Sequence, residues 1–199
     1  LFRKELYEMD IFLQYLITGL TVGSIYALLA VGYVTIYNVT GVINLAQGEF
    51  AMVGALSCVT LVNLGIPILG AIPIAILMTA IIGLAVERLA INPARKAAPI
   101  VLVIITLGVS IFIKGMGLII WGSSPKSLPP LFESKSIQFM GAVVNSQSLW
   151  IFVVLIAQLI ILYWFFDKTF IGSALRASEK NPRAASLMGI NTGTMSMIA

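Results

Sequence analysis

The chain has 199 residues, of which 59% are hydrophobic and 10% are charged, and its mean hydropathy is +1.03. A soluble domain carries roughly 25% charged residues because water must wet its surface, so this composition excludes a soluble protein. It predicts an all-α, polytopic bundle of transmembrane helices. There are 12 Lys and Arg against 8 Asp and Glu, one Cys and no His. These counts exclude a His triad, a His metal site and an intrachain disulfide. The basic residues form no patch with interleaved aromatic residues, so we expect no nucleic-acid partner.

Five apolar stretches follow one another along the chain. A hydrocarbon core of about 30 Å needs about 20 apolar helical residues. Four stretches meet this requirement: residues 11–36, 66–86, 100–120 and 148–166. A stretch at 50–64 is short for a full crossing. The residues after 191 resemble the opening of a sixth span, and Met9 would be a natural start, so we expect a fragment of a longer protein whose later spans are missing.

Two basic connections predict the orientation of the spans. They are residues 87–99, with Arg88, Arg95 and Lys96, and residues 167–191, with Lys168, Arg176, Lys180 and Arg183. Two spans separate them, so they share a side, which the positive-inside rule identifies as the cytoplasm. Residues 121–147 then lie outside, with a small hairpin expected over 137–144. Counting back three spans puts the N-terminus outside as well. We expect one membrane domain over residues 1–199.

The first span carries small residues at intervals of four: Gly19, Gly23 and Ala27. Helices in lipid approach closely at such positions, because van der Waals packing replaces the hydrophobic drive. We interpret this ridge as ordinary helix packing without a transport role.

The one cysteine, Cys58, lies in an apolar run and is interpreted as a small buried hydrophobic residue.

A polar segment, residues 38–49 (NVTGVINLAQGE), joins two apolar runs and holds Asn38, Asn44, Gln47 and Glu49. If residues 42–64 formed one helix, Glu49 would lie about 140° from Asn44, and an amide or a carboxylate would face lipid at high cost. A broken or re-entrant segment that lines a water-filled cavity removes this conflict. An interfacial loop with hydrated polar groups removes it equally well. On the first interpretation, these four residues are candidates for the substrate pathway.

Lys114 lies within the fourth span, six residues before its predicted end. Its ammonium group is able to meet a substrate carboxylate. The alternative, which we prefer, is that the long side chain reaches to the outer interface.

The cytoplasmic stretch at 169–191 predicts two short helices joined at a bend. Residues 171–180 favour a helix, which Asn181-Pro182 ends while starting the next, with Asn181 as N-cap and proline at the first helical position. Gly189 fits a left-handed C-terminal cap. An ordinary loop needs no such structure, whereas a projecting helix pair suits docking in a groove of a soluble partner. A helix lying on anionic lipid is the alternative, although its apolar face is thin.

The pattern Ala184-Ala185-x-x-x-Gly189 resembles the coupling signature of ABC importer permeases, the loop that engages the ATPase subunits. The preceding residues Gly172, Ala174, Leu175, Arg176 and Ala177 look like the form seen in branched-chain amino-acid permeases of the LivH type. Residues 23–32 (GSIYALLAVG) and 41–50 (GVINLAQGEF) are similar to the opening of that family. Arg183 departs from the pattern, because the signature usually has Glu there, so no particular salt bridge to the ATPase is expected.

This resemblance implies a permease subunit of an ATP-binding-cassette importer in a bacterial or archaeal plasma membrane. It implies alternating access for leucine, isoleucine, valine or a similar small solute. The implied partners are a second related permease, two cytoplasmic ATP-binding subunits and an external substrate-binding protein. ATP hydrolysis would belong to those partners, so we expect no enzyme activity, cofactor or metal here.

The main alternative is a secondary, ion-coupled transporter, although Glu49 is its sole acidic candidate and no repeat is visible. A membrane-embedded enzyme and a purely structural subunit are further alternatives. The sequence does not distinguish branched-chain amino acids from urea or short amides.

Overall fold

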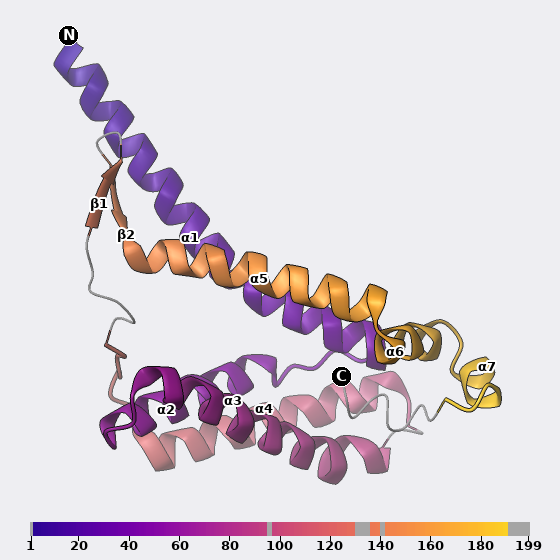
Figure 1. The fold of residues 1–199 in the computed structure, drawn as a ribbon. Coiled ribbons are helices and arrows are strands. Elements are labelled where there is room, and N and C mark those ends of the chain that lie inside the picture. The colour runs from indigo at the N-terminus through magenta and orange to yellow at the C-terminus, as the bar shows by residue number, and fades with distance from the viewer. Residues whose placement is uncertain (1, 95–96, 130–135, 140–141, 191–199) are drawn as a thin grey trace. The chain divides into compact units, whose positions relative to one another are not determined.

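The computed structural model describes residues 2–94, 97–129, 136–139 and 142–190 (Figure 1). The longer helices are α1 (Phe2–Thr40), α2 (Gln47–Asn63), α3 (Ile68–Val86), α4 (Pro99–Trp121) and α5 (Ser146–Lys168). Two short helices follow, α6 (Phe170–Lys180) and α7 (Pro182–Leu187). Within the described residues, four helices are long and apolar enough to cross a membrane: those covering Glu8–Asn38, Ile68–Ala94, Pro99–Trp121 and Ser146–Lys168. The prediction of a polytopic helical membrane protein is confirmed, and α2 is the short element expected. The sixth predicted span lies outside the described residues.

The chain divides into two units, Leu1–Val31 with Pro129–Thr169 and Gly32–Leu128 with Phe170–Ala199. The first contains most of α1, the hairpin of β1 (Ser136–Phe139) and β2 (Ala142–Asn145), and α5. The strands pair antiparallel, with Ser136 opposite Asn145. This confirms the predicted hairpin, and residues 140–141 between its strands lie outside the described residues. The Asn145 side chain then caps α5 by accepting the N–H of Gln147. The prediction of one membrane domain stays a prediction.

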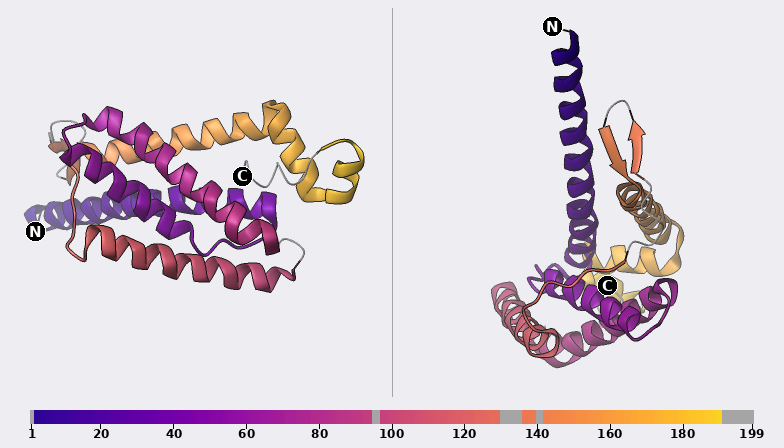
Figure 2. Two further views of the ribbon diagram at one scale, coloured as in Figure 1. Left: turned by 90° about the horizontal axis from the view of Figure 1, so that it is seen from below. Right: turned by 90° about the vertical axis from the view of Figure 1, so that its left-hand side faces the viewer.

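The second unit is built on α2, α3 and α4. Helices α2 and α3 lie side by side and antiparallel (Figure 2), and their shared core is Cys58, Ala71 and Ala75. Cys58 is thus the buried hydrophobic residue that the sequence predicted. Small residues at this contact let the two backbones approach.

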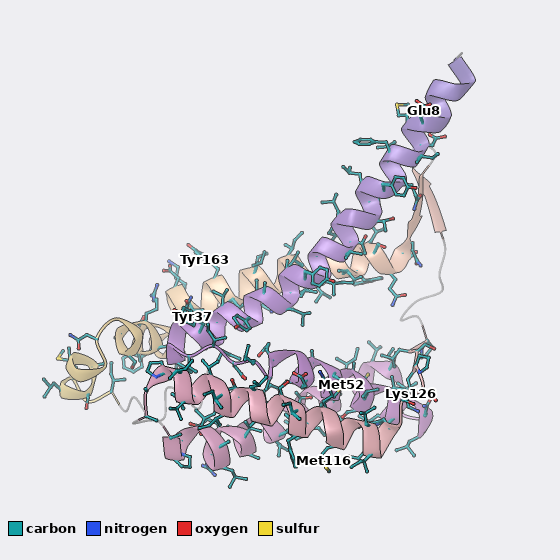
Figure 3. All side chains as sticks on the ribbon, turned by 180° about the vertical axis from the view of Figure 1, so that it is seen from behind. Glu8, Tyr37, Met52, Met116, Lys126 and Tyr163 are labelled. Carbon is teal, nitrogen blue, oxygen red and sulfur yellow. The ribbon has the colours of Figure 1, made fainter. Side chains whose placement is uncertain are left out.

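Helix α4 packs on α2 in the same direction. Trp121 at the end of α4 donates its indole N–H to Thr60 near the end of α2 at 2.8 Å. Earlier along both helices, Met52 (labelled in Figure 3) packs against Gly117, where an added Cβ would meet the methionine Cε at 2.9 Å. Met116 points to the other side of α4 (Figure 3). Helices α2 and α4 are therefore parallel neighbours, which fixes where α2 begins along α4.

The basic connection expected at 87–99 begins later than predicted. Helix α3 continues through a π-helical turn, η1 (Glu87–Ile91), and a 3₁₀ turn, η2 (Asn92–Ala94). Glu87 is buried and Arg88 exposed. The prediction of a loop from residue 87 was wrong, because good helix formers follow Val86 and the first proline comes at 93.

Candidate functional site

The polar segment is broken. Helix α1 ends at Thr40, Gly41 takes the left-handed conformation with φ of +66°, and α2 begins only at Gln47. The N–H of Gly41 bonds to the Tyr37 carbonyl at 2.8 Å, and the Thr40 hydroxyl accepts the N–H of Val42 at 3.2 Å. A non-helical connection, residues 41–46, therefore separates the two helices. The single continuous helix from residue 42, which would have exposed polar groups to lipid, does not form.

Thr106 on α4 holds this connection in place. Its hydroxyl accepts the backbone N–H of Leu45 at 3.2 Å and lies 3.3 Å from the carbonyl of Ile43. The Thr106 side chain is 1% exposed. Thr106 lies seven residues after Pro99, or about 10 Å along α4 at 1.5 Å per residue. With α4 across a bilayer, the connection lies within the hydrocarbon depth, where an open backbone group needs a protein partner. Sequence reasoning missed Thr106, since nothing local marks a threonine within an apolar run.

The Asn44 side chain bonds to the backbone of the connection itself. Its side-chain oxygen accepts the N–H of Ala46 at 3.0 Å, and Ala46 is fully buried. Asn44 therefore shapes the start of α2, because an amide bonded to its own backbone replaces a regular helical turn.

Gln47 lies between the end of α1 and a groove. A Cβ added at Gly32 of α1 would come within 2.9 Å of the Gln47 side-chain nitrogen. Gln47 also lines one end of a groove of about 410 Å³ between α2 and α3. The groove is largely apolar, with Gly54, Ala75 and the hydroxyl-bearing Thr79 among its lining residues. Its size suits a small solute or an apolar side chain.

Glu49 turns toward α4. Its Oε1 lies 3.4 Å from the Nζ of Lys114, and the Glu49 side chain is 12% exposed. Glu49 belongs to the first turn of α2, where the positive end of the helix dipole stabilises a carboxylate. The Lys114 ammonium is therefore paired with Glu49, which differs from the preferred expectation that it reaches outward alone.

The four predicted pathway residues thus have different surroundings. Asn44 caps the connection, Gln47 faces the groove and Gly32, and Glu49 pairs with Lys114. Asn38 is exposed in the last turns of α1. The structure gathers three of the four around the break, and adds Thr106 and Lys114 from α4.

The second candidate site is the bend between α6 and α7, here called the elbow, residues 170–190. Asn181 accepts the N–H of Ala184 through its side-chain oxygen at 3.0 Å, and Pro182 begins α7. At the other end, Gly189 has φ of +83°. The N–H of Ile190 bonds to the Ala185 carbonyl at 3.0 Å, and that of Gly189 to the Ser186 carbonyl at 3.1 Å. This pair of bonds is a Schellman motif. The predicted helix, cap, proline and glycine are all confirmed.

The predicted coupling residues differ in how deeply they are buried. Four are buried: Gly172, Ala174, Leu175 and Ala185. Ala177 is half-buried, and the other three are exposed: Arg176, Ala184 and Gly189. Leu175 is 1% exposed, so the small and apolar face of the elbow packs within the chain. The exposed apolar tip is instead Leu187 and Met188, at 88% and 84%. The resemblance had not marked these two, because they occupy variable positions of the signature.

The ridge on α1 is open. A Cβ added at Gly19 or Gly23 would meet nothing within 4 Å among the residues that the structure describes, and Ala27 is half-buried. Its role in helix packing stays a prediction.

A family model described as "Branched-chain amino acid transport system / permease component" matches residues 15–199. The chain belongs to this family. It is 31% identical over 201 residues to the high-affinity branched-chain amino acid transport system permease protein BraD of Pseudomonas aeruginosa. It is 32% identical over 195 residues to the LivH permease protein of Escherichia coli K12. It is 35% identical over 174 residues to the probable LivH permease protein of Methanocaldococcus jannaschii.

These alignments cover 94%, 91% and 82% of this permease-family chain, but 66%, 63% and 54% of the respective relatives. The chain therefore spans about two thirds or less of the length of the curated relatives it matches. No solved structure matches it. Membership of this family and four membrane-length helices make the chain a multi-pass protein of the plasma membrane.

Proposed function

We propose that this chain is a membrane-spanning subunit of an ATP-binding-cassette importer for branched-chain amino acids or a similar small solute. The observation that carries the proposal is the match of residues 15–199 to the permease family. The capped elbow supports it, because the residues that resemble an importer coupling signature lie there. The break between α1 and α2 supports a transport role, because irregular backbone at membrane depth is tolerated where it is packed in protein or lines a cavity.

The partners belong to the proposal. They are a second related permease, two cytoplasmic ATP-binding subunits and an external substrate-binding protein. ATP hydrolysis takes place in the ATP-binding subunits, so this chain contributes no enzyme chemistry. Closure of those subunits moves the elbow, and alternating access of the spans follows.

The elbow engages the ATP-binding subunits through its exposed tip. Because Leu175 and Ala185 are buried, they keep α6 and α7 at a fixed angle and transmit force. Leu187 and Met188 are available for an apolar pocket on the partner. The positions in the signature thus divide into residues that shape the elbow and residues beside them that dock.

The test is uptake of radiolabelled leucine into proteoliposomes that contain the complete transporter, with the loaded binding protein outside and ATP on the side of the ATP-binding subunits. We expect uptake to require ATP and to persist when proton and sodium gradients are collapsed. Met188→Glu should reduce uptake at least tenfold, whereas the matched variant Met188→Leu should keep it within twofold. Uptake driven by an ion gradient without ATP would overturn the proposal in favour of a secondary transporter.

A further inference from the structure

Glu49 and Lys114 form an ion pair between α2 and α4, away from either end of α4. Lys114 lies seven residues before Trp121, or about 10 Å along the helix. A charged group within a membrane helix is costly, so such residues usually serve a function and face protein or water. A neutral pair of similar size would pack α2 on α4 at least as well. Packing alone therefore does not account for this pair.

The pair is asymmetric. The Glu49 side chain is 12% exposed, and it sits in the first turn of α2, beside the connection that Thr106 holds. The Lys114 side chain is 64% exposed and ends a flexible four-carbon stem. The ammonium group is therefore able to leave the carboxylate without movement of either helix, whereas the carboxylate stays in place.

An apolar stripe flanks Lys114 on its own helix. Leu107, Ile111 and Leu118 precede and follow it at helical spacing and are 47%, 65% and 56% exposed. Residues three and four apart share one face, so the lysine lies in the middle of this stripe. A face that met only lipid would not carry a lysine at this depth. The stripe is suited to a small apolar side chain next to a charged group.

We propose that Glu49 and Lys114 form the part of the pathway that binds the α-ammonium and α-carboxylate groups of a zwitterionic amino acid. The ammonium of the solute donates to the Glu49 carboxylate, and its carboxylate accepts from the Lys114 ammonium. The solute thereby replaces each half of the ion pair, and no charge is left unpaired in either state. Its apolar side chain lies against the stripe. This inference rests on the proposed importer function and narrows its substrate class, because urea and short amides carry no such pair of charges.

The test uses the complete transporter in proteoliposomes, with radiolabelled leucine and the loaded binding protein. Glu49→Gln, Lys114→Met and the double variant are compared with wild type. We expect each of the three to lower the initial rate of uptake at least tenfold. ATP hydrolysis stimulated by the binding protein should stay within twofold of wild type in all three. Lys114→Arg, which keeps the charge, should retain uptake within threefold.

The double variant separates the site from a structural ion pair. If the pair only stabilises the helix contact, removal of both charges leaves nothing unpaired and uptake returns to within twofold of wild type, which would overturn the inference. Loss of uptake in Lys114→Arg equal to that in Lys114→Met would also overturn it. Uptake is compared per complex that elutes as an assembled particle in size-exclusion chromatography, so that a loss of assembly is not counted as a loss of transport. Failure of the wild-type complex to transport leucine would instead reject the proposed function.

Discussion

The hydroxyl of Thr106 on α4 accepts the backbone N–H of Leu45 at 3.2 Å and lies 3.3 Å from the carbonyl of Ile43. One side chain thus meets both a donor and an acceptor of the connection between α1 and α2, sixty-one residues away from Leu45 in the chain. The connection contains two further local bonds, from Val42 to Thr40 and from Ala46 to Asn44. The N–H groups of Val42, Leu45 and Ala46 are thus paired with side chains, two of them from the connection's own end and one from α4.

Thr106→Val should destabilise this connection. Valine has the same shape but no hydroxyl, so the N–H of Leu45 loses its partner at a cost of about 1 kcal/mol. We expect faster amide hydrogen exchange at residues 43–46 in the complete transporter, together with reduced leucine uptake. Thr106→Ser keeps the hydroxyl and should exchange at nearly the wild-type rate. Equal exchange in wild type and Thr106→Val would show that the hydroxyl does not hold the connection.

Local patterns predicted the elements of this fold well. Apolar length gave the four membrane-length helices, and Asn181, Pro182 and Gly189 gave the elbow because capping preferences depend on nearby backbone atoms alone. The pattern of polar residues at 38–49 favoured a break or an interfacial loop over one continuous helix. The loop expected from residue 87 failed, because that expectation followed basic charge and neglected the helix propensity of the residues after Val86.

Contacts between distant segments were not predictable in this way. The pairing of Lys114 with Glu49 and of Thr106 with Leu45 depends on α2 and α4 lying parallel and in one register. No periodicity in either segment specifies that register. For the same reason, the sequence marked Ala174, Ala185 and their neighbours as coupling residues without indicating that their small side chains are buried within the chain.

The contact between α2 and α4 predicts different effects for two glycines of one helix. Gly117 faces Met52, whose Cε would lie 2.9 Å from an added Cβ, whereas Gly115 has open space among the described residues. Valine at 117 requires the flexible end of the Met52 side chain to move, so we expect a loss of stability at the low end of the overpacking range, about 1 kcal/mol. Valine at 115 changes the helix propensity equally but meets no neighbour. We expect Gly117→Val to lower the Tm of the purified transporter by several degrees more than Gly115→Val, and equal Tm values would contradict this packing.

The side-chain cap that Asn181 forms should affect the coupling of ATP hydrolysis to transport. Its side-chain oxygen accepts the N–H of Ala184, so Asn181→Ala should cost about 1 kcal/mol and fray the start of α7. Asn181→Asp retains the acceptor. We expect the alanine variant to lower the ratio of leucine transported to ATP hydrolysed, and the aspartate variant to keep it. An unchanged ratio in Asn181→Ala would mean that the cap at the start of α7 does not contribute to the coupling of ATP hydrolysis to transport.

Gly189 and Gly122 both have positive φ, at +83° and +74°, and each follows the end of a helix. An L-residue in the left-handed region costs roughly 1–2 kcal/mol, which is the cost expected for alanine at Gly189. Gly122 has ψ of −174°, a conformation that essentially only glycine adopts, so alanine there should destabilise the chain at least as much and is a stringent control. Gly189 closes the Schellman motif of the elbow, whereas Gly122 ends α4 on the side expected to face outward. Gly189→Ala should therefore reduce ATP-driven leucine uptake severalfold, and Gly189→Val should reduce it further. Gly122→Ala should leave the rate within twofold of wild type. If both alanine variants lowered uptake equally, the loss would reflect general destabilisation, and the proposed role of the elbow in coupling would lose its support.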